Sequence, residues 1–419
     1  MASFRSDFVR VLHERGFVHQ VTDLAALDEA AAKGPITAYI GFDATAPSLH
    51  VGNLTQIMML RWLQKTGHRP IVLMGGATTR VGDPSGKDAS RSLLSEDAIA
   101  ANIASIRTVF GQFLSFGEAP VGAVMVDNYD WTAPLGYLDF LRTYGPHFTI
   151  NRMLSFDSVR LRLEREQPLS FLEFNYMLMQ AVDFLELHRR EGCLLQMGGS
   201  DQWGNIVNGV ELVRRIEARE VFGLTTPLIT LASGAKMGKT AAGAVWLNAD
   251  QLSPYDYWQF WRNTDDADVG RFLRLFTELP LDEIARLAAL QGAEINDAKK
   301  RLADETTGLL HGREAAETAR LAAEGAFERD EVSDALPTVT FPWAGEEGHR
   351  LRTAAALVHA SGLTSSLSDA RRQIAGGAVR INGVKILNDR DTFSRDAAVI
   401  DGVFKVQLGK KKIVLVRPV

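Results

Sequence analysis

The first half of the chain alternates short apolar runs with longer stretches in which apolar residues recur at helical spacing. Apolar runs of this length predict strands, and the amphipathic stretches predict helices. The expected strands cover residues 37–42, 70–74, 121–126 and 193–197, and the expected helices cover residues 54–65, 96–113, 134–144 and 169–188. This alternation is typical of an α/β protein with a Rossmann-type, doubly wound parallel sheet, in which ligands bind at the carboxyl ends of the strands.

The second half follows a different pattern. Between residues 253 and 324 helical periodicity takes over, with core candidates at Trp258, Phe260, Trp261, Phe272 and Phe276. Residues 330–348 are acidic, lack any period and contain two prolines, which predicts a linker. The expected domains are a catalytic domain over residues 1–225, a lysine loop with an α-helical domain over 226–330, a linker over 331–349 and a small α+β domain over 350–419.

Charge is distributed unevenly along the chain. The 419 residues carry a net charge of -5, yet the segment from Arg350 to Val419 has 13 Lys and Arg against 5 Asp and Glu. That segment is therefore at +8 and the remainder at -13. Such asymmetry predicts a small module that binds nucleic acid, attached to an acidic enzyme body.

Composition excludes several classes of protein. No stretch approaches the length of a membrane span, and the N-terminus does not read as a signal peptide. Cys193 is the single cysteine, which excludes an internal disulfide framework and suits a reducing cytosol. No Cys/His cluster has zinc-site spacing. We expect a cytoplasmic protein without membrane contact, metal site or tightly bound cofactor.

Two short motifs carry candidate phosphate chemistry. His50-Val51-Gly52-Asn53 opens the expected helix 54–65, so its backbone amides should lie at a helix N-terminus, where anions bind. Lys236-Met237-Gly238-Lys239-Thr240 places two lysines in a polar loop that could close over a triphosphate. Each motif alone also fits a satisfied histidine or solvated lysines. Together they resemble the two signature motifs of the class I aminoacyl-tRNA synthetases.

One face of the expected helix 169–188 carries a polar stripe. Tyr176, Gln180 and Asp183 fall at i, i+4 and i+7 in an otherwise apolar stretch. The stripe could face water. Alternatively it forms a pocket wall that grips a polar small molecule, because buried polar groups need partners.

Longer segments make the resemblance more specific. The Tyr-x-x-x-Gln-x-x-Asp spacing is followed by 198–205 (GGSDQWGN), and further matches are 39–43 (YIGFD), 82–87 (GDPSGK) and 253–255 (SPY). These motifs resemble those of the bacterial tyrosyl-tRNA synthetases, from about residue 37 to the C-terminus. The resemblance implies activation of L-tyrosine by ATP to tyrosyl-adenylate and pyrophosphate, followed by transfer of tyrosine to the 3′ end of tRNA-Tyr.

The resemblance also implies residue roles. Tyr39 and Asp183 would bind the phenolic hydroxyl of tyrosine, and Tyr176, Gln180 and Asp83 its ammonium group. Asn128 and Gln196 complete the expected tyrosine site. The expected catalytic residues are Thr45 and His50 at the γ-phosphate, Lys236, Lys239 and Thr240 over the pyrophosphate, and Lys87 and Arg91 as further cations. The expected ATP site comprises Gly41, Asp43, His50, Gly52, Asn53, Gly199, Asp201, Gln202, Lys236 and Lys239. Magnesium would enter with ATP as a substrate complex.

The sequence departs from the class pattern at three positions. Asn53 stands where the class signature has a second histidine, although its amide can still donate a hydrogen bond. Gly238 replaces a serine of the lysine-loop signature, which we expect to affect loop flexibility more than charge. Ile40 stands where some relatives offer a polar side chain near the ribose, so it is assigned no hydrogen-bonding role.

The C-terminal segment resembles a small RNA-binding domain first known from a ribosomal protein. Its plausible phosphate contacts are Arg371, Arg372, Arg380, Lys385, Lys410, Lys411 and Lys412. The resemblance also implies a homodimer, with an expected interface at residues 131–158. Two alternatives stay open: a tryptophanyl enzyme of the same fold, and an RNA-binding paralogue that has lost catalysis. Tyr39 with Asp183, together with the C-terminal RNA-binding segment, argues against the first alternative. Against the second argue the intact residues His50, Asp83, Lys236 and Lys239.

Overall fold

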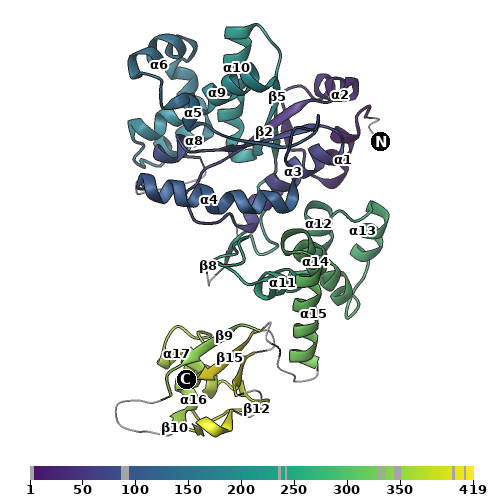
Figure 1. Cartoon of the computed structure of the whole chain (residues 1–419), viewed down its shortest axis with the longest axis vertical. Helices are drawn as coiled ribbons and strands as arrows, with labels where there is room; N and C mark the ends of the chain where they lie inside the picture. The colour runs from purple at the N-terminus through teal and green to yellow at the C-terminus, as the bar shows by residue number, and fades with distance from the viewer. Residues whose placement is uncertain are drawn as a thin grey trace. The chain divides into compact units, whose positions relative to one another are not determined.

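A computed structural model describes residues 4–85, 94–234, 237–240, 243–328, 333, 336–343, 351–398, 402–409 and 412–419. The chain divides into two compact units, one formed by residues 1–251 with 265–295 and the other by 252–264 with 296–419. Each unit has its own sheet and helices (Figure 1). In the described part of the chain, no helix is both long and apolar enough to cross a membrane.

The first unit is built on a sheet whose strand order is β1-β6-β5-β2-β3-β4. The strands are β1 (Gln20–Val21), β2 (Thr37–Phe42), β3 (Arg69–Met74), β4 (Val124–Asp127), β5 (Cys193–Gly199) and β6 (Phe222–Thr226). All neighbours pair in parallel except β1 and β6. This confirms the expected Rossmann-type α/β fold. The strand order reverses between β2 and β5, the position at which such sheets open a crevice for ligands.

Helices cover both faces of this sheet (Figure 1). They are α1 (Asp7–Arg15), α2 (Leu24–Lys33), α3 (Leu54–Lys65), α4 (Glu96–Phe113), α5 (Tyr129–Thr132), α6 (Tyr137–Tyr144), α7 (Ile150–Ser155), α8 (Asp157–Glu164), α9 (Phe171–Glu191) and α10 (Trp203–Glu217). Short 3₁₀ turns occupy Val51–Asn53, Thr78–Arg80, Gly145–His147 and Ser200–Gln202, and β7 (Lys239–Thr240) pairs with β8 (Gly243–Ala244). The apolar core centres on Tyr39, Ile71, Phe184 and Leu185, from β2, β3 and α9.

The helical segment α12 (Asp266–Phe276) and α13 (Leu281–Ala288) belongs to the first unit, whereas we expected it in a separate helical domain. Buried Arg15 of α1 donates to the carbonyl oxygens of Arg274, Thr277 and Leu279 at 3.1, 2.9 and 2.8 Å. Burial lowers the pKa of this guanidinium to about 10. These contacts join segments that lie far apart in the sequence, which periodicity does not reveal.

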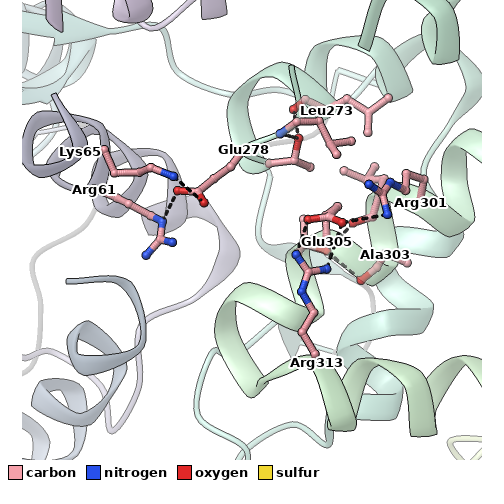
Figure 2. A network of polar contacts seen from close by, with 12 residues as sticks. Arg61, Lys65, Leu273, Glu278, Arg301, Ala303, Glu305 and Arg313 are labelled. Carbon is pink, nitrogen blue, oxygen red and sulfur yellow. Dashed lines mark hydrogen bonds and ion pairs between the residues drawn. The ribbon is translucent and has the colours of Figure 1, made fainter. Parts of the chain in front are cut away.

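A second attachment of this segment is an ion-pair cluster on Glu278. Its carboxylate receives Arg61 Nε at 2.6 Å and Lys65 Nζ at 2.9 Å, both from α3 (Figure 2). Burial alone would raise the pKa of Glu278, but the hydrogen bonds from these two cations outweigh burial and lower it. The carboxylate therefore stays ionised and stabilises the position of α12 and α13 on α3.

The second unit combines helices with a small sheet. Its helices are α11 (Pro254–Arg262), α14 (Ile295–His311), α15 (Arg313–Glu328), α16 (Ala354–Ala360) and α17 (Leu367–Ala375), with a 3₁₀ turn at Arg395–Ala397. Its strands are β9 (Thr338–Phe341), β10 (Leu351–Thr353), β11 (Val379–Ile381), β12 (Val384–Lys385), β13 (Thr392–Ser394), β14 (Phe404–Leu408) and β15 (Lys412–Pro418). Between α14 and α15, buried Glu305 pairs with Arg301 at 3.1 Å and Arg313 at 2.8 Å (Figure 2). The buried aromatic residues Trp258 and Trp261 lie on α11, as expected.

Part of the expected linker is instead a strand of the C-terminal sheet. The sheet order is β12-β11-β14-β15-β9, and Val339 of β9 pairs in parallel with Val416 of β15. Trp343 then stacks on Phe404 in the core, with ring centroids 5.3 Å apart. The linker prediction over 331–349 therefore does not hold for residues 338–343. The prolines suggested a linker, but β9 is an edge strand, where a nearby proline is tolerated.

Candidate active site

A pocket of about 700 Å³ opens at the carboxyl ends of the parallel strands. It is lined by each expected tyrosine-site residue, namely Tyr39, Asp83, Asn128, Tyr176, Gln180, Asp183 and Gln196. It is also lined by the nucleotide-side residues Gly41, Asp43, Thr45, His50, Gly52, Asn53, Gly199, Asp201 and Gln202. Residues from β2, β5, α9 and the loops after β3 and β4 are thus brought together at one pocket, where parallel strands end.

Several expected site residues cannot be placed. Lys87, Arg91, Lys236, Lys410 and Lys411 lie outside the described residues. Lys239 and Thr240 form β7, and the structure describes only their backbone.

The polar centre of the pocket is the carboxylate of Asp183, which is only 2% exposed. Its Oδ1 accepts the indole N–H of Trp131 at 2.9 Å, and its Oδ2 accepts an amide N–H of Asn128 at 3.0 Å. Burial raises the pKa of Asp183 to about 7, against the two hydrogen bonds, which lower it. Since both donors favour the ionised form, the carboxylate can accept a further hydrogen bond from a ligand hydroxyl.

Two residues that line the pocket from neighbouring strands each carry a buried polar atom. Among the described residues, the hydroxyl of Tyr39, a residue only 1% exposed, has no hydrogen-bond partner, and neither has Oε1 of Gln196. The two residues are register partners on β2 and β5. An unpaired buried polar group costs about 1–3 kcal/mol, so both atoms favour a ligand that offers polar groups.

Asn128 connects the two ends of the pocket. Its Oδ1 accepts the N–H of Ala77 at 2.7 Å, so its Nδ2 must be the donor to Asp183 and to Thr78 Oγ1, each at 3.0 Å. Thr78 in turn donates to Asp43 Oδ1 at 2.8 Å. A continuous hydrogen-bond chain therefore runs from Asp183 to Asp43, a residue expected on the nucleotide side.

Tyr176 also reaches Asp43. Its hydroxyl donates to Asp43 Oδ2 at 3.0 Å, and burial raises the pKa of the phenol well above its ordinary value. Because the hydroxyl hydrogen is used in this bond, the oxygen lone pairs of Tyr176 are the part that can accept from a ligand ammonium group.

A second set of hydrogen bonds organises the expected ammonium site. Gln202 Nε2 donates to Asp83 Oδ2 at 2.6 Å. Buried Asn205 donates from Nδ2 to Gln180 Oε1 at 3.0 Å and to Gln202 Oε1 at 3.2 Å. Gln202, expected beside the adenylate, thus also orients the carboxylate on the amino-acid side.

The His50 motif forms a capped turn rather than an open anion site. The amide of Gly52 donates to His50 Nδ1 at 3.0 Å, and the amides of Val51 and Asn53 donate to the carbonyl oxygens of Val245 and His50. These amides are therefore occupied, which corrects the expectation that they would bind an anion. Since Nδ1 accepts, the proton of a neutral His50 ring lies on Nε2, which makes the side chain the donor.

Sequence reasoning missed several residues of the site. Thr78 and Trp131 make hydrogen bonds described above, yet neither belongs to a motif quoted from the sequence. Asn205 ends the quoted motif 198–205, but it was assigned no role. A Cβ on Gly75 would lie 2.2 Å from Asp43 Oδ1, so this position needs glycine. The glycine- and threonine-rich run 75–79, directly after an expected strand, was the available signal.

The expected RNA-binding residues that the structure describes lie on the surface of the C-terminal sheet and its helix. Arg371, Arg372, Arg380, Lys385 and Lys412 are all exposed. Two of them are held by acidic neighbours, Arg371 by Asp389 at 3.2 Å and Arg372 by Asp369 at 2.6 Å.

Within the described ranges, no group of three or more His, Cys, Asp or Glu side chains could hold a metal ion.

Comparison with known families identifies the chain. Residues 31–328 match the family model of class I tRNA synthetases for tryptophan and tyrosine, and residues 330–416 match the C-terminal domain model of tyrosine–tRNA ligases. A tyrosine–tRNA ligase of Caulobacter sp. is 64% identical over 418 residues, covering 100% of this chain and 99% of the relative. The chain belongs to the tyrosine–tRNA ligase family of class I tRNA synthetases.

Other members of the tyrosine–tRNA ligase family support this assignment. The ligase of Xanthobacter autotrophicus is 62% identical over 417 residues, covering 100% of this chain and 99% of the relative. Among solved structures, a C-terminally truncated mitochondrial tyrosyl-tRNA synthetase of Aspergillus nidulans aligns with a TM-score of 0.69 and 32% identity, over 76% of this chain and 94% of that one. A Plasmodium falciparum tryptophanyl-tRNA synthetase, 14% identical with a TM-score of 0.53 over 75% of this chain and 88% of that one, shares the fold.

Proposed function

We propose that the chain activates L-tyrosine with ATP, forming tyrosyl-adenylate and pyrophosphate, and then transfers tyrosine to the 3′ end of tRNA-Tyr. The observation that carries this proposal is the pairing of a buried carboxylate, Asp183, with the unpartnered hydroxyl of Tyr39 at one pocket. A phenol offers one donor and one acceptor, which matches this pair. Phenylalanine would offer no hydrogen bond to either group and would leave the hydroxyl of Tyr39 without a partner among the described residues.

The ammonium group of tyrosine would lie between the oxygen atoms of Tyr176, Gln180 and Asp83. Tyr176 accepts because its own proton is used at Asp43, and Asp83 is oriented by Gln202. One negative charge and two neutral acceptors suit a cation of this size. With the hydroxyl and ammonium both fixed, the tyrosine carboxylate would point toward the nucleotide side of the pocket.

Adenylate formation would then proceed by attack of the tyrosine carboxylate on the α-phosphorus of ATP. The carboxylate is already ionised at neutral pH, so this step needs no general base. Catalysis would rest on positioning and on stabilising charge as pyrophosphate leaves. His50 would contribute an Nε2–H donor and Thr45 a hydroxyl, since the turn amides have internal partners. Magnesium would arrive with ATP.

The C-terminal unit would bind tRNA through its exposed basic side chains. Arg371 and Arg380 lie on α17 and β11, and Lys412 begins β15. Contacts of these side chains to phosphates would supply affinity that falls with increasing salt. The lone buried thiol of Cys193 suits the cytoplasm, where tRNA is charged.

We propose that the protein is a homodimer through an apolar surface of the first unit. Its exposed large side chains are Tyr137 and Leu138 on α6, Ile150 and Leu154 on α7, Leu161 and Leu163 on α8, and Phe171 and Leu172 on α9. Exposed apolar side chains gathered on consecutive helices are typical of an interface. A second copy of the chain is the occupant, and the surface extends beyond the expected range 131–158.

The test is amino-acid-dependent ATP–pyrophosphate exchange with tyrosine, phenylalanine and tryptophan. We expect exchange with tyrosine alone and its loss in Asp183→Ala. Glu186→Ala is the matched control, because it removes a carboxylate from the same helix without altering the pocket lining. Exchange with tryptophan would instead support the tryptophanyl alternative, and folded protein without any exchange would support the RNA-binding paralogue.

A further inference from the structure

The two signature motifs are in direct contact. The N–H of Val51 donates to Val245 O at 2.9 Å, and the N–H of Leu247 donates to Leu49 O at 2.9 Å. His50 and Trp246 form an antiparallel bridge between these bonds. The N–H of Val245 also donates to Gly238 O at 3.1 Å. Backbone hydrogen bonds thus link the end of the lysine loop to the His50 turn.

Gly238 is the point of closest approach. A Cβ at this position would lie 2.8 Å from His50 Nδ1, 3.3 Å from His50 Cε1 and 3.0 Å from the amide nitrogen of Gly52. The amide of Gly52 and Nδ1 of His50 are the donor and the acceptor of one hydrogen bond. A methyl group on residue 238 would therefore press on both atoms of that bond. Gly238 also has φ of +93°, which L side chains rarely adopt.

Gly52 is constrained in the same way from the other side. A Cβ on Gly52 would lie 2.6 Å from His50 Cε1 and 3.1 Å from Met237 O. The imidazole of His50 is therefore confined by two glycines, one from each motif. The space that holds this ring and its Nδ1 bond to Gly52 is thus bounded in part by the lysine loop.

We propose that Gly238 is a positioning residue for adenylate formation, because it leaves the space in which the His50 ring keeps its Nδ1 bond to Gly52 and therefore its proton on Nε2. This role differs from the expected effect on loop flexibility, because it requires both a positive φ at residue 238 and the absence of a side chain where this residue meets His50. It rests on the proposed function, in which His50 acts on the departing pyrophosphate.

The test compares Gly238→Ala with Gly234→Ala. Gly234 lies in the same loop with φ of +82°, but a Cβ there would meet no atom of the described residues within 4 Å. Both variants place alanine at a positive φ, which strains the backbone. Only the alanine of Gly238→Ala would contact His50. We expect Gly238→Ala to lower kcat for tyrosine-dependent exchange by roughly 10- to 100-fold, since a displaced catalytic group costs that much. Gly234→Ala should lose about threefold or less, and the tyrosine dissociation constant should be unchanged in both.

A double-mutant cycle separates the contact from strain. In the His50→Ala background most of the contact is gone, so adding Gly238→Ala should cost only about threefold. An equal loss in Gly234→Ala, a full loss retained in the His50→Ala background, or loss of tyrosine binding in Gly238→Ala would each overturn the inference. Absence of tyrosine-dependent exchange in the unmodified protein would instead overturn the proposed function, and this role with it.

Discussion

The side-chain amide of Asn128 donates a 3.0 Å hydrogen bond to the carboxylate of Asp183 and cannot rotate, because its carbonyl oxygen accepts the Ala77 N–H. The same amide donates to Thr78, which donates to Asp43. The carboxylate of Asp183, which would bind the substrate hydroxyl, is thereby connected to Asp43, the residue expected beside the nucleotide. A fixed network of this kind limits the orientations that Asp183 can adopt.

Replacing Trp131 by phenylalanine tests the second donor to Asp183. Trp131→Phe removes the 2.9 Å indole hydrogen bond while keeping an aromatic ring. Hydrogen bonds to charged groups contribute about 1.5–3 kcal/mol, so tyrosine should bind roughly tenfold or more weakly at neutral pH. Equilibrium binding of tyrosine measures this. Trp62→Phe is the control, because the indole N–H of Trp62 has no hydrogen-bond partner in the described part of the chain. Unchanged affinity in Trp131→Phe would contradict the assigned role.

The pH dependence of tyrosine binding follows from the pKa of Asp183, raised by burial to about 7. The carboxylate gains the charge that accepts the phenolic hydrogen as pH rises through that value, so affinity should increase from about pH 6 to about pH 8. Loss of a donor raises the pKa further, so the curve of Trp131→Phe should lie at higher pH. A titration by calorimetry checks both, and a flat profile would mean that Asp183 ionises well outside this range.

Glu278→Gln tests the attachment of α12 and α13. The pKa of Glu278 is lowered in the folded protein, so its contribution to stability is present above the ordinary value of 4.5 and is lost as pH falls. We expect the variant to lose about 1–2 kcal/mol of unfolding free energy at neutral pH, because the pair is largely buried. The difference should vanish in acid. Urea unfolding at both pH values measures it, with exposed Glu294→Gln as control; equal loss in both variants would refute the cluster's role.

Leu138→Glu tests the proposed dimer surface. A charge on this exposed α6 residue would be buried without a partner in an interface, which costs several kcal/mol. The variant should elute as a monomer of 46.0 kDa, and the unmodified chain at twice that mass. Light scattering after size exclusion distinguishes the two. Leu321→Glu places the same charge on an exposed leucine of α15 and should leave the mass unchanged. A dimeric Leu138→Glu variant would move the interface elsewhere.

Lys405→Met tests how the C-terminal module is fixed to α15. Lys405, only 2% exposed, donates from Nζ to the carbonyl oxygen of Ala326 at 2.7 Å, in the last turn of that helix. The variant removes this hydrogen bond, so we expect the KM for tRNA to rise roughly three- to tenfold. Tyrosine-dependent exchange should stay unchanged. Lys33→Met, which removes an exposed ammonium group, is the control; an unaltered KM in Lys405→Met would show that the contact does not position the module.

The sequence by itself determined the α/β class and the residues of the pocket that belong to recognisable motifs. Hydrophobic alternation placed β2, β3 and β5, because strands buried on both faces read as continuous apolar runs. Helical spacing placed Tyr176, Gln180 and Asp183 on one face, and the structure sets all three on the pocket wall. A local sequence pattern is enough to predict a feature that depends only on the periodicity of one helix or strand.

Only the tertiary structure decided which groups meet. The partners of Asp183 come from the loop and helix after β4, Arg15 joins α1 to a segment some 260 residues later, and β9 joins a sheet whose other strands follow it. The space that Gly238 leaves for His50 likewise exists only once the two motifs touch. Hydrogen bonds and close contacts between distant segments leave no periodic signal, because each depends on how the chain folds back on itself.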